Sequence, residues 1–145
     1  MNVTPCIGIC STTYGDLVCR GCKRYAHEIV DWNRYGEGQH DVVCQRLTQL
    51  RDASVSEFIE VKDEAALRRA GKAIRLPISS QRTVLTVAYE VLRRSSRIPQ
   101  LDDLGLARSS FAAGVAPERL FGAIDREFYT RAVAVYERSF HTVAQ

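Results

Sequence analysis

The chain has 145 residues, a formal net charge of +3 and a pI near 8.7; 46% of its residues are hydrophobic and 26% are charged. This composition is typical of a soluble globular protein and argues against an intrinsically disordered chain. No apolar stretch approaches the roughly 20 residues of a transmembrane helix, and the first residues lack the pattern of a secretory signal. We therefore expect a cytoplasmic protein without membrane contact, where reducing conditions keep cysteines available for metal binding or redox chemistry.

Charge is distributed unevenly along the chain. Residues 1–45 carry four Lys/Arg against five Asp/Glu, whereas residues 46–145 carry 16 against 12. The mild positive bias of the later part permits contact with nucleic acid but does not require it.

The first part of the chain is rich in cysteine. Four of the five cysteines lie within residues 6–22, and none lies beyond Cys44. By composition the chain has a four-cysteine head, residues 1–36, and a body rich in Ala, Arg, Leu and Val, residues 37–145, although the two can also form one continuous domain.

The head cysteines follow the spacing C-x3-C-x8-C-x2-C. Each close pair encloses a glycine, Gly8 or Gly21, and glycine lets the backbone fold back so that both sulfurs point at one ion. Two such turns that face each other complete a tetrahedral sulfur site, for one zinc ion or one iron–sulfur cluster. The predicted metal ligands are Cys6, Cys10, Cys19 and Cys22.

The spacing leaves the identity of the metal open. Two separated short pairs look more like zinc knuckles than like common iron–sulfur runs, but the central gap is shorter than the roughly 15–20 residues of zinc ribbons. Four thiolates give either centre a formal charge of −2, and Arg20, Lys23 and Arg24 are close enough in sequence to offset it. A redox dithiol at Cys19–Cys22 is disfavoured because the βαβ context of such motifs is missing.

The head also resembles a known family. Its motifs are P-C-I-G-I-C at residues 5–10, C-x-G-C-x-R at residues 19–24 and E-I-x-x-W at residues 28–32. Over about residues 5–36 they resemble a family of small uncharacterised bacterial proteins labelled "predicted Fe–S protein". The resemblance implies an iron–sulfur cluster on the four cysteines. Tyr25 stands where the family has threonine, at a position outside the ligand set.

The body shows a series of helical patterns. Apolar residues have helical spacing over residues 43–50. Ser54 and Glu57 have the spacing of a capping box, which predicts the start of a new helix. Asp63 is the expected N-cap of a further helix, which Gly71 would end.

Two stronger helical patterns follow in the second half. Residues 84–92 form an apolar stripe of period 3.6, followed by arginines that complement the helix dipole, and Pro99 would stop this helix. Pro117 suits the first turn of the last helix, which has a continuous apolar face over residues 120–136. No segment alternates with period 2. We therefore predict a mainly α fold with little sheet, in which a small four-cysteine metal-binding head packs on a helical body.

Residues 109–124 weakly resemble a helix-turn-helix, with Gly114 in the turn. In that case the candidate residues for contact with nucleic acid are Arg108, Arg119 and Arg126. An ordinary pair of helices with solvated arginines explains the same pattern and is favoured, since short motif matches of this kind often arise by chance.

The chain contains no Ser/His/Asp set, phosphate-binding glycine loop or paired carboxylates in a defined motif, so we do not expect an enzyme. We expect a metal-binding protein with a structural centre, whose body binds a protein partner. One alternative is a redox or iron–sulfur-carrying accessory protein; the other is a nucleic-acid-binding regulator that uses the basic body. Cys44 and Trp32 are expected to be packed in the core.

Overall fold

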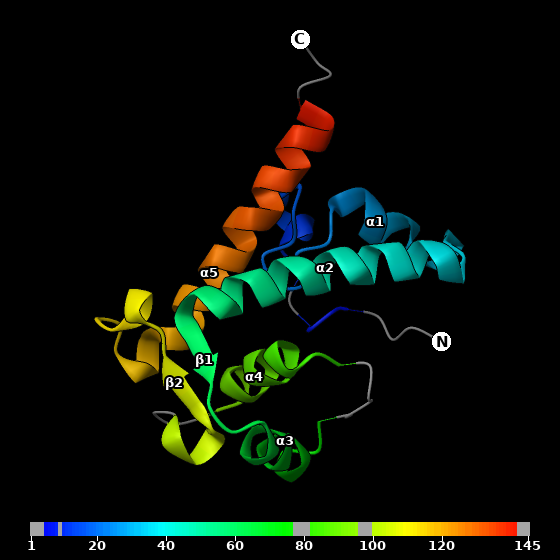
Figure 1. Cartoon of the computed structure of the whole chain (residues 1–145). Helices are drawn as coiled ribbons and strands as arrows, with labels where there is room; N and C mark the ends of the chain where they lie inside the picture. The colour runs from blue at the N-terminus through cyan, green and yellow to red at the C-terminus, as the bar shows by residue number, and fades with distance from the viewer. Residues whose placement is uncertain (1–4, 9, 77–81, 96–99, 142–145) are drawn as a thin grey trace. The chain divides into compact units, whose positions relative to one another are not determined.

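The computed structural model describes residues 5–8, 10–76, 82–95 and 100–141 (Figure 1). In this part of the chain the fold is mainly α, as predicted, with five α-helices, short 3-10 turns and one two-stranded sheet. The elements are α1 Ala26–Asp31, α2 Glu37–Phe58, β1 Ile59–Val61, α3 Glu64–Ala73, α4 Val84–Arg93, β2 Leu106–Arg108 and α5 Pro117–Tyr136.

Contacts group the chain into two compact units, which differ from the two segments defined by composition. The first unit combines residues 1–50 with residues 127–145, and the second unit contains residues 51–126. The grouping differs because α2 and α5 each continue from one unit into the other. Composition along the chain does not show which distant segments meet.

A hairpin around the second cysteine pair forms the core of the first unit. Val18 and Tyr25 pair as an antiparallel bridge, and both are buried. Their side chains form a hydrophobic cluster with Ala132 in the second half of α5. The partly buried side chains that pack against this cluster are Leu50, Tyr129, Val133 and Tyr136. The hairpin is therefore held in place by a helix more than 100 residues further along the chain.

Helix α2 is longer than the sequence predicted. Ser54 lies inside it and is fully buried, so the helix start predicted at Ser54 and Glu57 is wrong. The helix continues to Phe58 and leads directly into β1, which pairs antiparallel with β2 so that Glu60 lies opposite Ala107. Each strand has three residues, which confirms the prediction of little sheet.

Helices α3 and α4 lie side by side in the second unit (Figure 1), and both begin at side-chain caps. The carboxylate of Asp63 accepts the N–H of Ala66 at 3.1 Å, as predicted. The hydroxyl of Thr83 accepts the N–H of Thr86 at 3.1 Å. Contrary to the prediction, α3 does not end at Gly71, which is buried within its last turn. Pro99, predicted to stop α4, lies outside the described residues.

The last helix begins at Pro117, as predicted, but the segment before it is not helical in the way expected. Strand β2 and the 3-10 turn Ser110–Ala112 occupy the place of the first helix of a helix-turn-helix. Residues 109–124 therefore form neither a helix-turn-helix nor a pair of α-helices. The apolar face of α5 is buried, as the pattern predicted, at Leu120, Ile124, Phe128 and Ala132.

Gly105 directly precedes β2 and contacts the backbone at the start of α3. We expect alanine at this position to destabilise the second unit. Gly105 has a φ of +71°, and an added Cβ would lie 2.2 Å from the carbonyl oxygen of Asp63. The left-handed conformation and the forced backbone shift together predict a loss of about 3 kcal/mol for Gly105→Ala. Urea unfolding measures this loss. Gly114→Ala, where no atom lies within 4 Å of the added Cβ, is the control; similar losses in both variants would contradict the prediction.

Ionisation of Tyr89 in α4 is expected to lower the free energy of unfolding at alkaline pH. Its hydroxyl donates to Asp125 Oδ1 at 2.6 Å. Burial, followed by the negative charge of Asp125, raises the pKa of Tyr89 far above 10. An unfolded tyrosine ionises near pH 10, so the contribution of Tyr89 is complete below pH 10. Above it, this contribution falls by up to about 1.4 kcal/mol per pH unit. We expect Tyr89→Phe to show a shallower loss of unfolding free energy between pH 9 and 11; parallel curves would exclude this role.

Candidate metal centre

The second cysteine pair lies at the tip of the hairpin of the first unit. The N–H of Cys19 donates to the carbonyl of Arg24, and the N–H of Lys23 donates to the carbonyl of Cys19, each at 2.9 Å. Lys23 has a φ of 67°, in the left-handed region that tight turns use. This turn brings the thiols of Cys19 and Cys22 within hydrogen-bonding reach of each other.

Backbone N–H groups surround the sulfur of Cys19. Burial alone raises the pKa of this thiol, but hydrogen bonds from the backbone of Cys22, Ser11 and Gly21, and from the Cys22 side chain, outweigh burial. Together they lower the pKa of Cys19 from 9.0 to about 7. A lowered pKa favours the thiolate, which is the form of cysteine that binds metals.

Two further cysteines receive hydrogen bonds from the backbone two residues ahead. The N–H of Gly8 donates to Cys6 Sγ at 3.3 Å. The sulfur of Cys22 accepts from the backbone of Arg24 and, at 3.3 Å, from its Nε. Burial is the larger effect at Cys22 and raises the pKa of its thiol. The two cysteine pairs thus share one local feature, an N–H group directed back at a sulfur.

Ser11 attaches the first cysteine pair to the second. Ser11 follows Cys10 and begins a 3-10 turn, Ser11–Tyr14. Its hydroxyl accepts the N–H of Arg20 at 2.8 Å, while its backbone donates to the sulfur of Cys19. The residue next to Cys10 is therefore bound directly to the turn that carries the second pair.

The four predicted ligands differ in exposure and are not all gathered at one point. Cys19 and Cys22 are 1% and 7% exposed, Cys10 is partly buried, and Cys6 is exposed. Among the residues that the structure describes, no three His, Cys, Asp or Glu side chains form a group able to hold a metal ion. The structure brings together Cys19 and Cys22, and it places Cys10 next to Ser11, whose backbone donates to the sulfur of Cys19.

Two cations are buried next to the second pair. Lys23 is 0% exposed, donates to the carbonyl of Gly21 at 2.9 Å and lies 5.1 Å from the ring of Phe128. Arg24 is 4% exposed and donates to Cys22 Sγ. Burial of positive charge is costly unless negative charge lies nearby, and a metal bound by four thiolates supplies that charge. The donors and the charges therefore fit a zinc ion or an iron–sulfur cluster equally well.

Arg20, which the sequence also offered as a compensating charge, is not buried with this pair. Its side chain is 65% exposed and forms an ion pair with Asp16 at 3.3 Å. Its guanidinium also lies 4.8 Å from the ring of Tyr129. Of the three cations next to the second pair in sequence, only Lys23 and Arg24 are therefore buried with it.

The sequence reasoning missed a buried ion pair that fastens the hairpin to α2. Glu28 is 5% exposed and accepts the N–H of Tyr25 at 2.9 Å. Arg46 donates two hydrogen bonds to its carboxylate, at 2.6 and 2.7 Å, and lies 4.0 Å from the ring of Tyr25. The spacing of Tyr25 and Glu28 is that of a capping box, which was the available signal in the sequence. Arg46 had no such signal.

Trp32, the aromatic residue of the E-I-x-x-W motif, is packed in the core, as expected. It is 9% exposed and stacks on His40, with ring centroids 4.0 Å apart. The guanidinium of Arg24 lies 4.8 Å from the Trp32 ring. Trp32 thus supports the arginine that contacts Cys22. Cys44, which the sequence also placed in the core, is only partly buried.

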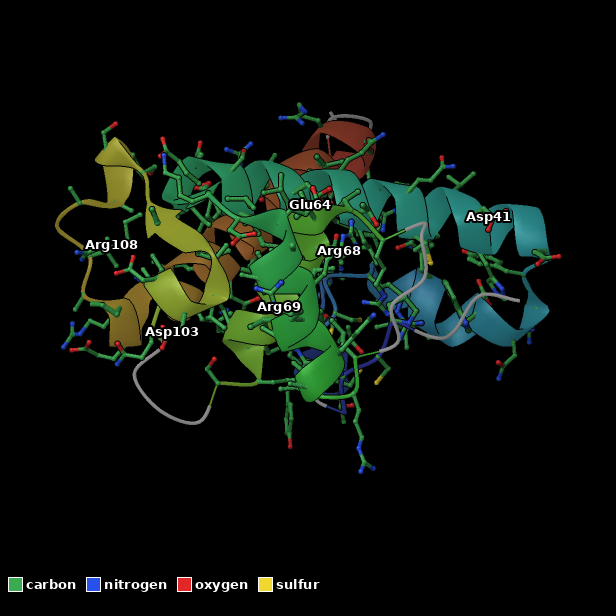
Figure 2. The ribbon with its side chains drawn as sticks, turned by 60° about the horizontal axis from the view of Figure 1, so that its bottom comes forward. Asp41, Glu64, Arg68, Arg69, Asp103 and Arg108 are labelled. Carbon is green, nitrogen blue, oxygen red and sulfur yellow. The ribbon has the colours of Figure 1, made fainter. Side chains whose placement is uncertain are left out.

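The candidate residues for nucleic-acid contact lie in the second unit without a helix-turn-helix around them. Arg108 of β2, labelled in Figure 2, donates to the carbonyl of Val115 at 2.6 Å. Arg119 and Arg126 are exposed on α5, and their spacing of seven residues puts them on one face.

Comparison with known families agrees with the motif resemblance in part. A family described as "Protein of unknown function (DUF1289)" has a model that matches residues 4–51. This is about a third of the chain and includes the cysteine head, α1 and much of α2. The match is consistent with a small uncharacterised family and says nothing about iron or sulfide. No curated protein and no solved structure matches the chain.

In the described residues, none of the helices combines the length and apolar character that spanning a membrane requires.

Proposed function

We propose that this chain binds one metal centre, a zinc ion or an iron–sulfur cluster, through Cys6, Cys10, Cys19 and Cys22. The observation that carries the proposal is the set of backbone N–H groups directed at the sulfurs of Cys6, Cys19 and Cys22. Hydrogen bonds of this kind stabilise thiolates, and metals bind thiolates. Attachment of Ser11 to the second turn supports closure of the first pair on the same metal.

The proposed centre is structural. Cys19 and Cys22 are nearly inaccessible, so a substrate or a disulfide of another protein cannot readily reach their sulfurs. A bound metal instead cross-links residues 6–22 and contributes free energy to the folding of the first unit. We place the protein in the cytoplasm, where thiols stay reduced, with the body available to a protein partner.

A redox or cluster-carrying role is the second candidate, and the buried cations are compatible with it. Lys23 and Arg24 lie beside the proposed ligands. Buried positive charge stabilises the more negative, reduced form of an iron–sulfur cluster and so raises its reduction potential. Zinc has no redox chemistry, so the two roles make different predictions for the spectrum.

The metal content of the protein tests these proposals. Protein purified without oxygen is analysed for iron, zinc and sulfide, and its visible spectrum is recorded before and after reduction. One zinc per chain in a colourless protein supports a structural centre. Iron and sulfide with a reversible visible band support the redox role. Absence of both metals in stoichiometric amount would overturn the proposed centre.

A further inference from the structure

The second unit carries a concentration of positive charge that the metal proposal does not use. Residues 65–95 contain six Arg, one Lys and a single acidic residue, Glu90, although the whole chain has a net charge of only +3. Glu90 forms an ion pair with Arg93 at 2.9 Å and lies 3.9 Å from Arg94. Arg93 and Arg94 of α4 therefore share one carboxylate, and most of the excess charge belongs to α3 and the residues after it.

The excess cations lie on the outer side of α3. Arg68 and Lys72 are spaced i and i+4 and so share one side of α3, with Arg69 next to them, and Arg75 follows the end of the helix, where its φ is 59°. Arg69, Lys72 and Arg75 are exposed. Leu67, on the other side of the helix, is fully buried. Figure 2 shows α3 from this outer side, with Arg68 and Arg69 labelled. We call these four cations the α3 basic surface.

Acidic residues lie at the N-terminal end of α3. Asp63 caps α3, and Glu64 pairs with Arg68 at 3.2 Å. Asp102 and Asp103 lie in a 3-10 turn that contacts α3 and is followed by Gly105, whose carbonyl accepts the N–H of Asp63. The acidic groups thus lie toward the start of α3, and an anionic partner would be drawn to its C-terminal half.

We propose that the α3 basic surface binds the phosphate backbone of a nucleic acid. Arg68 to Lys72 spans about 6 Å along α3, and Arg75 extends the basic surface beyond the end of the helix. One nucleic-acid strand has a phosphate about every 3.4 Å of its axis, so the four cations match about three phosphates. Three of the four are arginines, whose planar guanidinium donates paired hydrogen bonds to phosphate oxygens. This proposal does not depend on the metal centre.

A membrane surface suits these residues less well. Helices that bind membrane surfaces insert large apolar side chains next to their cations. Within α3 the described residues include no exposed large hydrophobic side chain; Ile74, at 36% exposed, follows the helix end. The α3 basic surface therefore has a single half-exposed apolar side chain, Ile74, beside its four cations, less than the set of large apolar side chains that a membrane-binding helix inserts.

Fluorescence anisotropy with a labelled DNA duplex of mixed sequence and a labelled single-stranded RNA tests the proposal on the full-length protein as purified. We expect dissociation constants of about 1–100 μM between about 50 and 200 mM salt. About three phosphate contacts require a salt slope near −3 for the duplex and near −2 for the single strand. Arg69→Glu combined with Lys72→Glu should weaken binding at least about tenfold. Arg119→Glu combined with Arg126→Glu makes the same change in charge on the exposed face of α5 and should retain binding within about threefold.

Three results would overturn the proposal. They are no salt-dependent binding to either probe, equal loss of binding in the two double variants, and binding to phosphatidylserine vesicles in place of nucleic acid. Circular dichroism checks that each variant is folded. If the glutamate variant does not fold, the pair Arg69→Ala and Lys72→Ala replaces it, with an expected loss of about fivefold; unchanged binding in that pair also overturns the proposal.

Discussion

The Cys19→Ser protein is expected to lose its metal and much of the stability of the first unit. Cys19 is 1% exposed, and the backbone of three residues donates to its sulfur. A serine hydroxyl stays protonated near neutral pH and cannot replace a thiolate ligand. We expect metal content to fall from about one to below about 0.2 per chain, and the free energy of unfolding to fall by at least about 3 kcal/mol. Elemental analysis and urea unfolding, followed through the fluorescence of the single tryptophan, Trp32, measure both.

Two further serine variants show whether this effect belongs to the four proposed ligands. Cys44→Ser changes a partly buried cysteine of α2 outside both pairs, so it should keep its metal and lose less than about 1 kcal/mol. Cys6→Ser should lose the metal even though Cys6 is exposed, because the proposal makes it a ligand. Metal retained in full by Cys6→Ser would remove Cys6 from the ligand set. Metal retained by Cys19→Ser would reject the centre itself.

Periodic patterns and capping residues predicted most of the helical fold. Asp63 begins α3 and Pro117 begins α5, because both features act through the neighbouring backbone. The helix start predicted at Ser54 was wrong, because tertiary packing can bury a serine inside a long helix even when its spacing from a glutamate is that of a capping box. Strands β1 and β2 have three residues each, too few to show a period of two.

The candidate site was predictable to the extent that its parts are close in sequence. Cys19, Gly21, Cys22 and the neighbouring Arg24 all lie within one turn. Contacts between distant segments have no local sequence pattern. Examples are the hydrogen bond of Ser11 to the second turn and the bonds of Arg46 to the Glu28 carboxylate, 18 residues earlier. Patterns in a single sequence predict local structure, which depends on residues close together in the chain. Ion pairs and packing between distant segments depend on the tertiary fold, which these patterns do not show.

The Glu28→Ala protein is expected to lose about 4 kcal/mol of unfolding free energy, because the change leaves the largely buried Arg46 guanidinium without its carboxylate. The same change removes the acceptor for the N–H of Tyr25 at the end of the cysteine hairpin. Glu28→Gln keeps an acceptor at that position and should lose less. Thermal and urea unfolding of the three proteins, at one pH and one metal content, give the comparison.

Glu64→Ala is the matched control, since Glu64 also pairs with an arginine but on the surface of α3. The Glu64 side chain is 59% exposed, against 7% for Glu28, and solvent-exposed pairs contribute about 0.5 kcal/mol or less. A large difference between the two alanine variants would show that burial gives the Glu28–Arg46 pair its importance. A loss at Glu28 as small as that at Glu64 would mean that the hairpin does not depend on this pair. The glutamate of the E-I-x-x-W motif would then need an explanation other than fastening α1 to α2.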